Sequence, residues 1–335
     1  MTRYSDHDPM LSIVVPMYNE AAVLPAFLER VNSVVTDLGV SHEVIFVDDG
    51  SDDESSAIIQ AECTRNARIR LVQLSRNFGK EVALTAGLDH AVGQAVVPLD
   101  ADLQDPPELI EQMLAEWRAG YDVVLAVRSR RVNDGWLKRK SAAAFYATIN
   151  KLSGINIPPE AGDFRLMDRR VVEEVRGLRE RSRFMKGIFA WVGFSHSVVE
   201  YERPLRAAGT TKFNFWKLWN FALDGITGFS TVPLRLAGYI GFLTAITSIL
   251  YGSYLVYRTL VSGVDLPGYA SLMVAVLFLG GLQLMVLGII GEYLGRNYTE
   301  SKNRPLYVVK DRAGFGDNET GGAIEHGRLV ESDAS

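Results

Sequence analysis

The sequence contains a single cysteine, Cys63, among 335 residues. One cysteine cannot form an intrachain disulfide, and it excludes a zinc site built from several thiolates. The net charge is only -5, with both signs mixed along the chain, so the basic face that nucleic-acid binding requires is missing. The sequence therefore excludes a disulfide framework and argues against a nucleic acid as partner.

Two phosphate-binding fingerprints are also missing. No GxGxxG follows the first apolar run, and GxxxxGK[ST] occurs nowhere in the sequence. Dehydrogenases and P-loop enzymes are therefore disfavoured. The first ten residues, MTRYSDHDPM, lack the basic stretch and apolar core of a signal peptide, which predicts that the N-terminal domain stays in the cytoplasm.

Two long uncharged stretches lie in the last third of the chain, Leu236 to Tyr257 and Leu266 to Gly291. Because about 20 apolar residues cross a bilayer, they predict two transmembrane helices at about 236–257 and 268–291. Cations flank the pair on its outer sides, with Arg258 alone in the connection. The positive-inside rule therefore predicts a hairpin with both outer ends in the cytoplasm.

From residue 11 onward, short β-branched runs alternate with helical patterns, which is typical of a parallel sheet covered by helices. The predicted strands are 11–16, 43–48, 69–75, 95–100 and 122–127, and GDFRLMDRR at 162–170 predicts a further strand and turn. Polar residues follow four of these strands. Ligands bind beyond the carboxyl ends of strands in such sheets, so we expect one shared site there.

An acidic pair, Asp100 and Asp102, follows the fourth predicted strand, with Gln104 just beyond. Two carboxylates in this position suit a hard divalent cation, Mg²⁺ or Mn²⁺, that also binds a diphosphate. A second acidic pair, Asp48 and Asp49, follows the second strand. A carboxylate there accepts hydrogen bonds from a nucleoside in dinucleotide folds, although Asp48 or Ser51 would also serve as a cap of the next helix.

The predicted organisation has four parts. Residues 1–210 form a cytoplasmic α/β domain, 211–232 an aromatic-rich amphipathic helix on the membrane surface, 233–296 the transmembrane hairpin, and 297–335 a cytoplasmic tail. Disorder is expected after residue 310, where charged residues and glycine dominate. Small residues on one face of the first membrane helix (Gly241, Ala245, Ser248, Gly252) favour close packing within the hairpin or between subunits of a homo-oligomer.

Six motifs occur in an order that resembles the family 2 glycosyltransferases, and more narrowly the polyprenyl-phosphate sugar transferases such as bactoprenol glucosyltransferases and dolichol-phosphate mannose synthases. They are VVPMYNE (14–20), VDDGSDD (47–53), RNFGK (76–80), DADLQDPPE (100–108), GDFRLMDRR (162–170) and RAAGTTKFN (206–214). The resemblance covers about residues 10–300. It implies a GT-A type catalytic domain at the inner membrane of a bacterium.

The resemblance also implies roles for particular residues. The nucleoside of the donor would be surrounded by Pro16, Tyr18, Glu20, Asp49 and Lys80, while Asp100, Asp102 and Gln104 would hold the metal ion and the diphosphate. The phosphate of the acceptor lipid or the donor would be bound by Arg206, Thr211 and Lys212, with Arg183 and Lys186 as further candidates.

The reaction implied by the resemblance is transfer of a hexose, most simply glucose from UDP-glucose, to a polyprenyl phosphate with inversion at the anomeric carbon. A phosphate monoester is mostly ionised at neutral pH, so the acceptor needs no strong general base. Asp163 matches the family position often discussed as a base, and we expect it to orient groups instead.

Three alternatives stay open. One is a mannosyltransferase that uses GDP-mannose, although the two-helix hairpin and KLSGINIPPEAGDFRLMDRR favour the glucosyltransferase type. A second is a non-catalytic membrane scaffold whose acidic turns bind metal only to stabilise the fold. The third is a phosphatase or phosphotransferase with Asp48 as nucleophile, which leaves the Asp100 and Asp102 pair unexplained.

Overall fold

The computed structural model describes residues 9–128, 161–181, 183–201, 230–262, 268–316, 324–325 and 328–329. The chain divides into two compact units. The first comprises Met1–Asn214 together with Arg304–Ser335, and the second is Phe215–Asn303. Residues 211–229 of the predicted membrane-surface helix, with Arg206, Thr211 and Lys212, lie outside the described residues.

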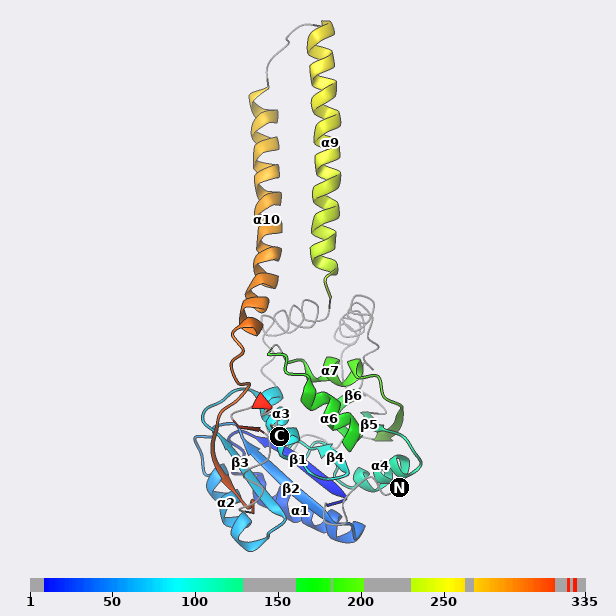
Figure 1. Ribbon diagram of the computed structural model, residues 1–335, viewed down its shortest axis with the longest axis vertical. Coiled ribbons are helices and arrows are strands. Elements are labelled where there is room, and N and C mark those ends of the chain that lie inside the picture. Colours follow the sequence, from blue (N-terminus) through cyan, green and yellow to red (C-terminus); the bar gives the residue numbers. More distant parts are fainter. Residues whose placement is uncertain are drawn as a thin grey trace, which may run out of the picture. The chain divides into compact units, whose positions relative to one another are not determined.

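An eight-stranded sheet forms the centre of the first unit, in the order β7-β5-β6-β4-β1-β2-β3-β8 (Figure 1). Its strands are β1 (Leu11–Met17), β2 (His42–Asp48), β3 (Ile69–Leu74), β4 (Ala95–Pro98), β5 (Val123–Arg128), β6 (Ala161–Asp168), β7 (His196–Tyr201) and β8 (Val309–Ala313). Strands β4, β1, β2 and β3 are parallel neighbours, whereas β6 and β8 run antiparallel to theirs. The predicted α/β architecture with a mostly parallel sheet is confirmed.

Helices cover both faces of this sheet. They are α1 (Leu24–Leu38), α2 (Ser55–Arg65), α3 (Lys80–His90), α4 (Leu109–Arg118), α6 (Arg169–Gly177) and α7 (Met185–Trp191). One core joins α1, α2 and α4 to alternate residues of β1 such as Ile13 and Val15. On the opposite face α3 packs so closely against β1 that a Cβ added at Gly87 would lie 2.1 Å from the side chain of Val14.

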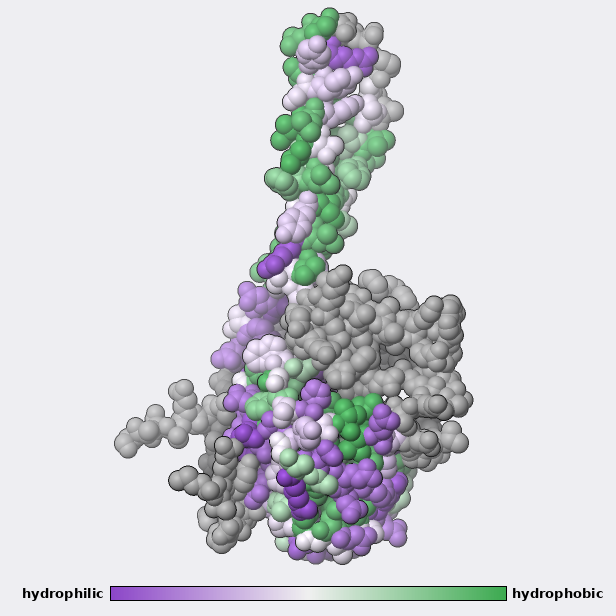
Figure 2. Space-filling model, turned by 90° about the vertical axis from the view of Figure 1, so that its right-hand side faces the viewer, coloured by the Kyte–Doolittle hydropathy of each residue, from purple (hydrophilic) through white to green (hydrophobic). Residues whose placement is uncertain are grey.

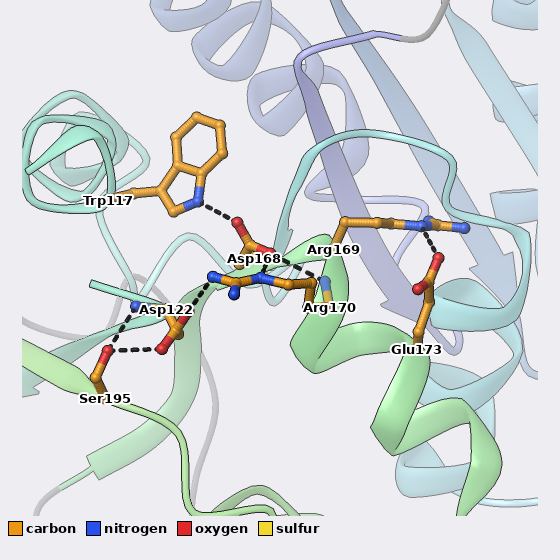
Figure 3. A network of polar contacts seen from close by, with 7 residues as sticks. All are labelled: Trp117, Asp122, Asp168, Arg169, Arg170, Glu173 and Ser195. Carbon is orange, nitrogen blue, oxygen red and sulfur yellow. Dashed lines mark hydrogen bonds and ion pairs between the residues drawn. The ribbon is translucent and has the colours of Figure 1, made fainter. Parts of the chain in front are cut away.

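A polar network clamps the end of β6 to its neighbours (Figure 3). Asp168 caps α6 by accepting from the backbone N–H of Arg170, and it also accepts from the indole of Trp117 at 2.9 Å. The guanidinium of Arg170 in turn donates a hydrogen bond to the carboxylate of Asp122. Asp122 also accepts from the Ser195 hydroxyl at 2.7 Å. The network therefore holds β5, β6 and the approach to β7 in a fixed arrangement.

The segment after residue 303 returns to the first unit as an edge strand. Tyr307 is fully buried, and β8 pairs antiparallel with β3. Disorder after residue 310 is therefore a wrong prediction for residues 311–313. The prediction failed because it relied on the polar composition of this segment. An edge strand is held by backbone hydrogen bonds on one side and needs few apolar side chains. A separate antiparallel pair joins β9 (Ile324–Glu325) to β10 (Arg328–Leu329).

The second unit consists of two long apolar helices, α9 (Val232–Ser262) and α10 (Tyr269–Ser301). Both are long and apolar enough to cross a membrane, and their large apolar side chains are exposed (Figure 2). The predicted spans, 236–257 and 268–291, match these helices to within one residue at the start of α10. Helix α9 extends further at both ends and α10 extends further at its C-terminal end. A Cβ added at Gly241 or Gly252 would meet nothing within 4 Å in the described part of the chain, so these glycines do not pack closely against α10.

Candidate active site

A cleft of about 280 Å³ opens where β1, β2 and β4 end. Its lining includes seven of the residues predicted to bind the donor or metal, together with Met17, Asn77, Gly79, Ala83 and Ala101. The seven are Pro16, Tyr18, Glu20, Asp49, Lys80, Asp100 and Asp102. The structure therefore brings together residues that are spread over more than 80 positions of the sequence, as the parallel order of the strands predicts.

Close contacts between the loops shape the cleft. The backbone N–H of Asn19 donates to the hydroxyl of Ser51 at 3.0 Å, and Asn19 accepts from the N–H of Asp52 at 2.9 Å. Gly50 has a φ of 72°, and a Cβ there would lie 2.6 Å from the carbonyl carbon of Arg76. Only glycine allows this approach, which brings the loop after β2 against the loop after β3.

Asp49 organises one wall of the cleft. Its two carboxylate oxygens accept from the backbone N–H groups of Phe78 at 2.7 Å and Gly79 at 2.9 Å. Burial raises the pKa of this carboxyl, and the two hydrogen bonds oppose the increase. Asp49 thus orders the turn that leads into Lys80, a structural role that the sequence did not predict for it.

Lys80 joins two carboxylates, one in the loop that follows β4 and one on β6. Its ammonium nitrogen lies 2.7 Å from Oδ2 of Asp100 and 3.1 Å from Oδ2 of Asp163. Burial opposes the charge on Lys80, but the two carboxylates outweigh it and raise the pKa of the ammonium group. Lys80 is therefore positively charged at any physiological pH.

Asp163 lies on β6 with its side chain mostly shielded from solvent. Burial alone would raise its pKa, yet the charges of Lys80 and Lys186 outweigh burial and lower it. The group is therefore a carboxylate at neutral pH, and its low pKa makes it a weak proton acceptor. One of its oxygens, Oδ1, is buried and has no hydrogen-bond partner among the residues that the structure describes.

The acidic pair after β4 has the donor atoms that a divalent cation prefers. Asp100 and Asp102 both line the cleft, and Asp102 accepts from the backbone N–H of Gln104 at 3.1 Å and from its side-chain amide. In the part of the chain that the structure describes, no three His, Cys, Asp or Glu side chains form a complete metal site. The two carboxylates fit an ion whose remaining ligands are water and diphosphate oxygens, which is the usual arrangement for Mg²⁺.

Carboxylates crowd this end of the cleft. Burial raises the pKa of Glu20, and the negative charges of Asp102 and Asp100 raise it further. Burial also raises the pKa of Asp100, where Lys80 opposes the shift. Such repulsion between neighbouring carboxylates is relieved when a cation binds among them.

The geometry agrees with the comparisons to known proteins. The family Glycosyl transferase family 2 matches residues 12–176, and the GtrB C-terminal hairpin matches residues 232–296. An uncharacterized glycosyltransferase of Synechocystis is 53% identical over 91% of this chain and 96% of that protein. The chain belongs to glycosyl transferase family 2.

Two further relatives of this glycosyltransferase have more specific names. The bactoprenol glucosyl transferase of Shigella phage SfV is 51% identical over 90% of this chain and 98% of that protein. The prophage bactoprenol glucosyl transferase homolog of Escherichia coli K12 is 48% identical over 90% of this chain and 98% of that protein. The two apolar helices and the matching hairpin indicate that this glycosyltransferase associates with a membrane.

Two of the predicted phosphate-binding residues of the glycosyltransferase lie outside the lining of the cleft. Lys186 is close enough to lower the pKa values of Asp163 and Glu81, and Arg183 acts in the same direction on Glu81. Burial lowers the pKa of Arg183 itself. Lys186, on α7, therefore lies near Asp163 and Glu81, and Arg183, just before α7, lies near Glu81. Their binding of phosphate stays a prediction.

Two further residues lie in this region, and they were not identified from the sequence as part of the site. Glu81 is the second residue of α3, directly after Lys80, and burial, reinforced by Asp163, raises its pKa to about 7. Arg165 is buried two positions after Asp163 on β6, and its guanidinium lies 4.2 Å from the centre of the Phe189 ring. Side chains alternate between the two faces of a strand, so residues 163 and 165 lie on the same face. This alternation could have predicted that Arg165 lies near Asp163.

Proposed function

We propose that this glycosyltransferase transfers glucose from UDP-glucose to bactoprenol phosphate, a polyprenyl phosphate carrier lipid, at the cytoplasmic face of a bacterial plasma membrane. The observation that carries the proposal is the 51% identity over 90% of the chain to a bactoprenol glucosyl transferase. It is supported by the cleft that gathers the predicted donor residues, and by the hairpin that would keep the catalytic domain beside its lipid acceptor.

The cleft would bind the nucleotide sugar. Pro16, Tyr18 and Glu20 would line the side of the nucleoside, and Asp49 would contribute by holding the turn at Phe78 and Gly79. Asp100 and Asp102, with Gln104 supporting Asp102, would hold Mg²⁺ or Mn²⁺. When bound, such an ion neutralises charge on the diphosphate and makes UDP a better leaving group.

Lys80 would stabilise the same leaving group from the protein side. Its ammonium group is charged, reaches the cleft and is already held between Asp100 and Asp163. Fixed positive charge beside a developing negative charge lowers the barrier because it needs no rearrangement during the reaction. Asp163 would keep this ammonium group in place, which is an orienting role.

The reaction would be a displacement at the anomeric carbon. An oxygen of the acceptor phosphate forms a bond to this carbon while the bond to the UDP oxygen breaks, and UDP leaves with the electron pair. The configuration inverts. No proton needs to be removed from an ionised phosphate, which fits the low pKa of Asp163.

The acceptor would approach from the membrane side of the catalytic domain. Arg206, Thr211 and Lys212, together with Arg183 and Lys186, would bind its phosphate, because arginine and lysine beside a membrane are suited to an anionic lipid head group. We include in the proposal a homo-oligomer whose membrane helices pack through the small-residue face of α9.

A panel of donors tests the proposal. The purified full-length chain is given bactoprenol phosphate, Mg²⁺ and one of UDP-glucose, UDP-galactose, UDP-N-acetylglucosamine or GDP-mannose, and release of the nucleoside diphosphate is measured. We expect acceptor-dependent release of UDP from UDP-glucose at a rate well above the others. Preference for GDP-mannose would instead establish the mannosyltransferase alternative.

A further inference from the structure

Tyr201, on strand β7, contacts the loop that follows β4 and contains Asp100 and Asp102. Its hydroxyl donates to Oδ1 of Asp105 at 2.5 Å, and both side chains are buried. Asp105 lies three positions after Asp102, whereas Tyr201 is the last residue of β7, 96 positions away from Asp105. A buried hydrogen bond to a carboxylate at this distance is strong and directional.

The loop between Asp100 and Asp105 needs to be held. Leu103 has a φ of 55°, in the left-handed region that residues with a Cβ rarely adopt. Such a backbone persists only where surrounding contacts fix it. Contacts of this kind include the two bonds from Gln104 to Asp102, which span Leu103, and the bond from Tyr201 to Asp105 at the end of the loop.

Tyr201 itself lies on a rigid support. Strand β7 pairs along its whole length with β5, and the network of Figure 3 clamps the beginning of both strands through Asp122 and Ser195. The Tyr201 ring also meets Phe164 edge to face at 6.4 Å, and Phe164 is the neighbour of Asp163. One side chain therefore contacts both the loop of Asp102 and the strand of Asp163.

We propose that Tyr201 is a positioning residue that holds the Asp100–Asp105 loop in the conformation that binds the divalent cation and the donor diphosphate. It touches neither of them. The inference rests on the proposed function of the cleft, and it adds a residue that none of the six sequence motifs contains.

The test uses Tyr201→Phe, which removes the hydroxyl and keeps the ring against Phe164. Binding of Mn²⁺ to the purified full-length chain in the presence of UDP is measured from the electron paramagnetic resonance signal of free Mn²⁺. We expect about tenfold weaker Mn²⁺ binding, because a lost hydrogen bond to a charged group corresponds to roughly a factor of ten in a binding constant. Tyr121→Phe, which alters an exposed tyrosine before β5, is the matched control.

A double-mutant cycle separates positioning from a general loss of stability. In the Asp105→Asn background the effect of Tyr201→Phe on Mn²⁺ binding should shrink at least threefold, since the two residues act through one bond. Equal Mn²⁺ affinity in the wild type and Tyr201→Phe, or additive effects in the cycle, would overturn the inference while leaving the proposed function intact. A wild-type chain that does not bind Mn²⁺ with UDP would overturn the metal proposal and this inference together.

Discussion

The ammonium nitrogen of Lys80 lies 3.1 Å from Oδ2 of Asp163, although 83 positions separate the two residues in sequence. The same nitrogen lies 2.7 Å from Oδ2 of Asp100, which lines the cleft. A single cation thus links the acidic pair that follows β4 to the carboxylate on β6. The charge states of all three groups depend on this contact, as their pKa shifts indicate.

Replacing Lys80 should disable the reaction more than it disturbs the fold. Lys80→Met removes the fixed positive charge, so we expect the initial rate of sugar transfer to fall by about 100-fold or more. The rate is measured with labelled donor and saturating acceptor. Lys80→Arg, which keeps the charge on a bulkier group, should retain more activity than Lys80→Met. Similar losses in both variants would show that shape rather than charge matters at this position.

Removal of divalent cations should stop transfer. After treatment with EDTA we expect activity to fall to background and to return when Mg²⁺ or Mn²⁺ is added, because Asp100 and Asp102 alone repel the diphosphate. Asp102→Asn removes one carboxylate and should need at least about tenfold more metal for half-maximal rate. Undiminished activity of the metal-free chain would refute the assigned metal site.

Glu81 should make the stability of the folded chain depend on pH. The unfolded chain binds this proton up to a pH of about 4.5, whereas the folded chain keeps it up to about 7. Between these values the folded state binds more protons, so stability that is present at low pH is lost as the pH rises from 4.5 to 7. Glu81→Gln cannot ionise, and its thermal midpoint should fall less than that of the wild type across this window. Parallel pH profiles for the two proteins would contradict the assignment.

A cluster around Asp89 should anchor the segment that follows the hairpin. Asp89 accepts from two nitrogens of Arg179 at 2.7 and 3.0 Å and from the hydroxyl of Tyr307 at 2.8 Å. Asp89→Ala leaves the partly buried guanidinium of Arg179 without its buried carboxylate partner and should destabilise the chain by about 3–5 kcal/mol. Tyr307→Phe removes one hydrogen bond and should cost about 1 kcal/mol.

Thermal unfolding of the detergent-purified chain measures both variants of the Asp89 cluster. Tyr121→Phe, at an exposed site, is the control and should leave the midpoint unchanged. A midpoint for Asp89→Ala equal to that of the wild type would mean that the cluster does not stabilise the fold.

The arrangement of the cleft could be predicted because it follows from buried strands. Runs such as residues 11–16 and 95–100 are almost continuously apolar, as strands buried on both faces are, and parallel strands bring their carboxyl ends together. Asp49, Lys80, Asp100 and Asp102 follow such runs or their loops, so their meeting in one cleft required no knowledge of side-chain packing.

Other features depend on contacts that a linear pattern does not record. The binding of the nucleoside by Asp49 stays a prediction, but the sequence did not show that its oxygens accept from the backbone of a loop about 30 positions away. Tyr201 and Asp105 come from segments with no shared periodicity. Strand β8 was not predicted because it is a polar strand at the edge of the sheet, where pairing depends on backbone hydrogen bonds rather than on apolar side chains.

The most direct measurement is transfer of ¹⁴C from UDP-[¹⁴C]glucose into extractable lipid by the purified full-length chain, with and without bactoprenol phosphate and with Asp102→Asn in parallel. The account predicts label in the lipid only when the acceptor is present, at a rate that Asp102→Asn lowers by at least about 100-fold. Folded, metal-replete protein that gives no labelled lipid, or an Asp102→Asn variant as active as the wild type, would contradict it.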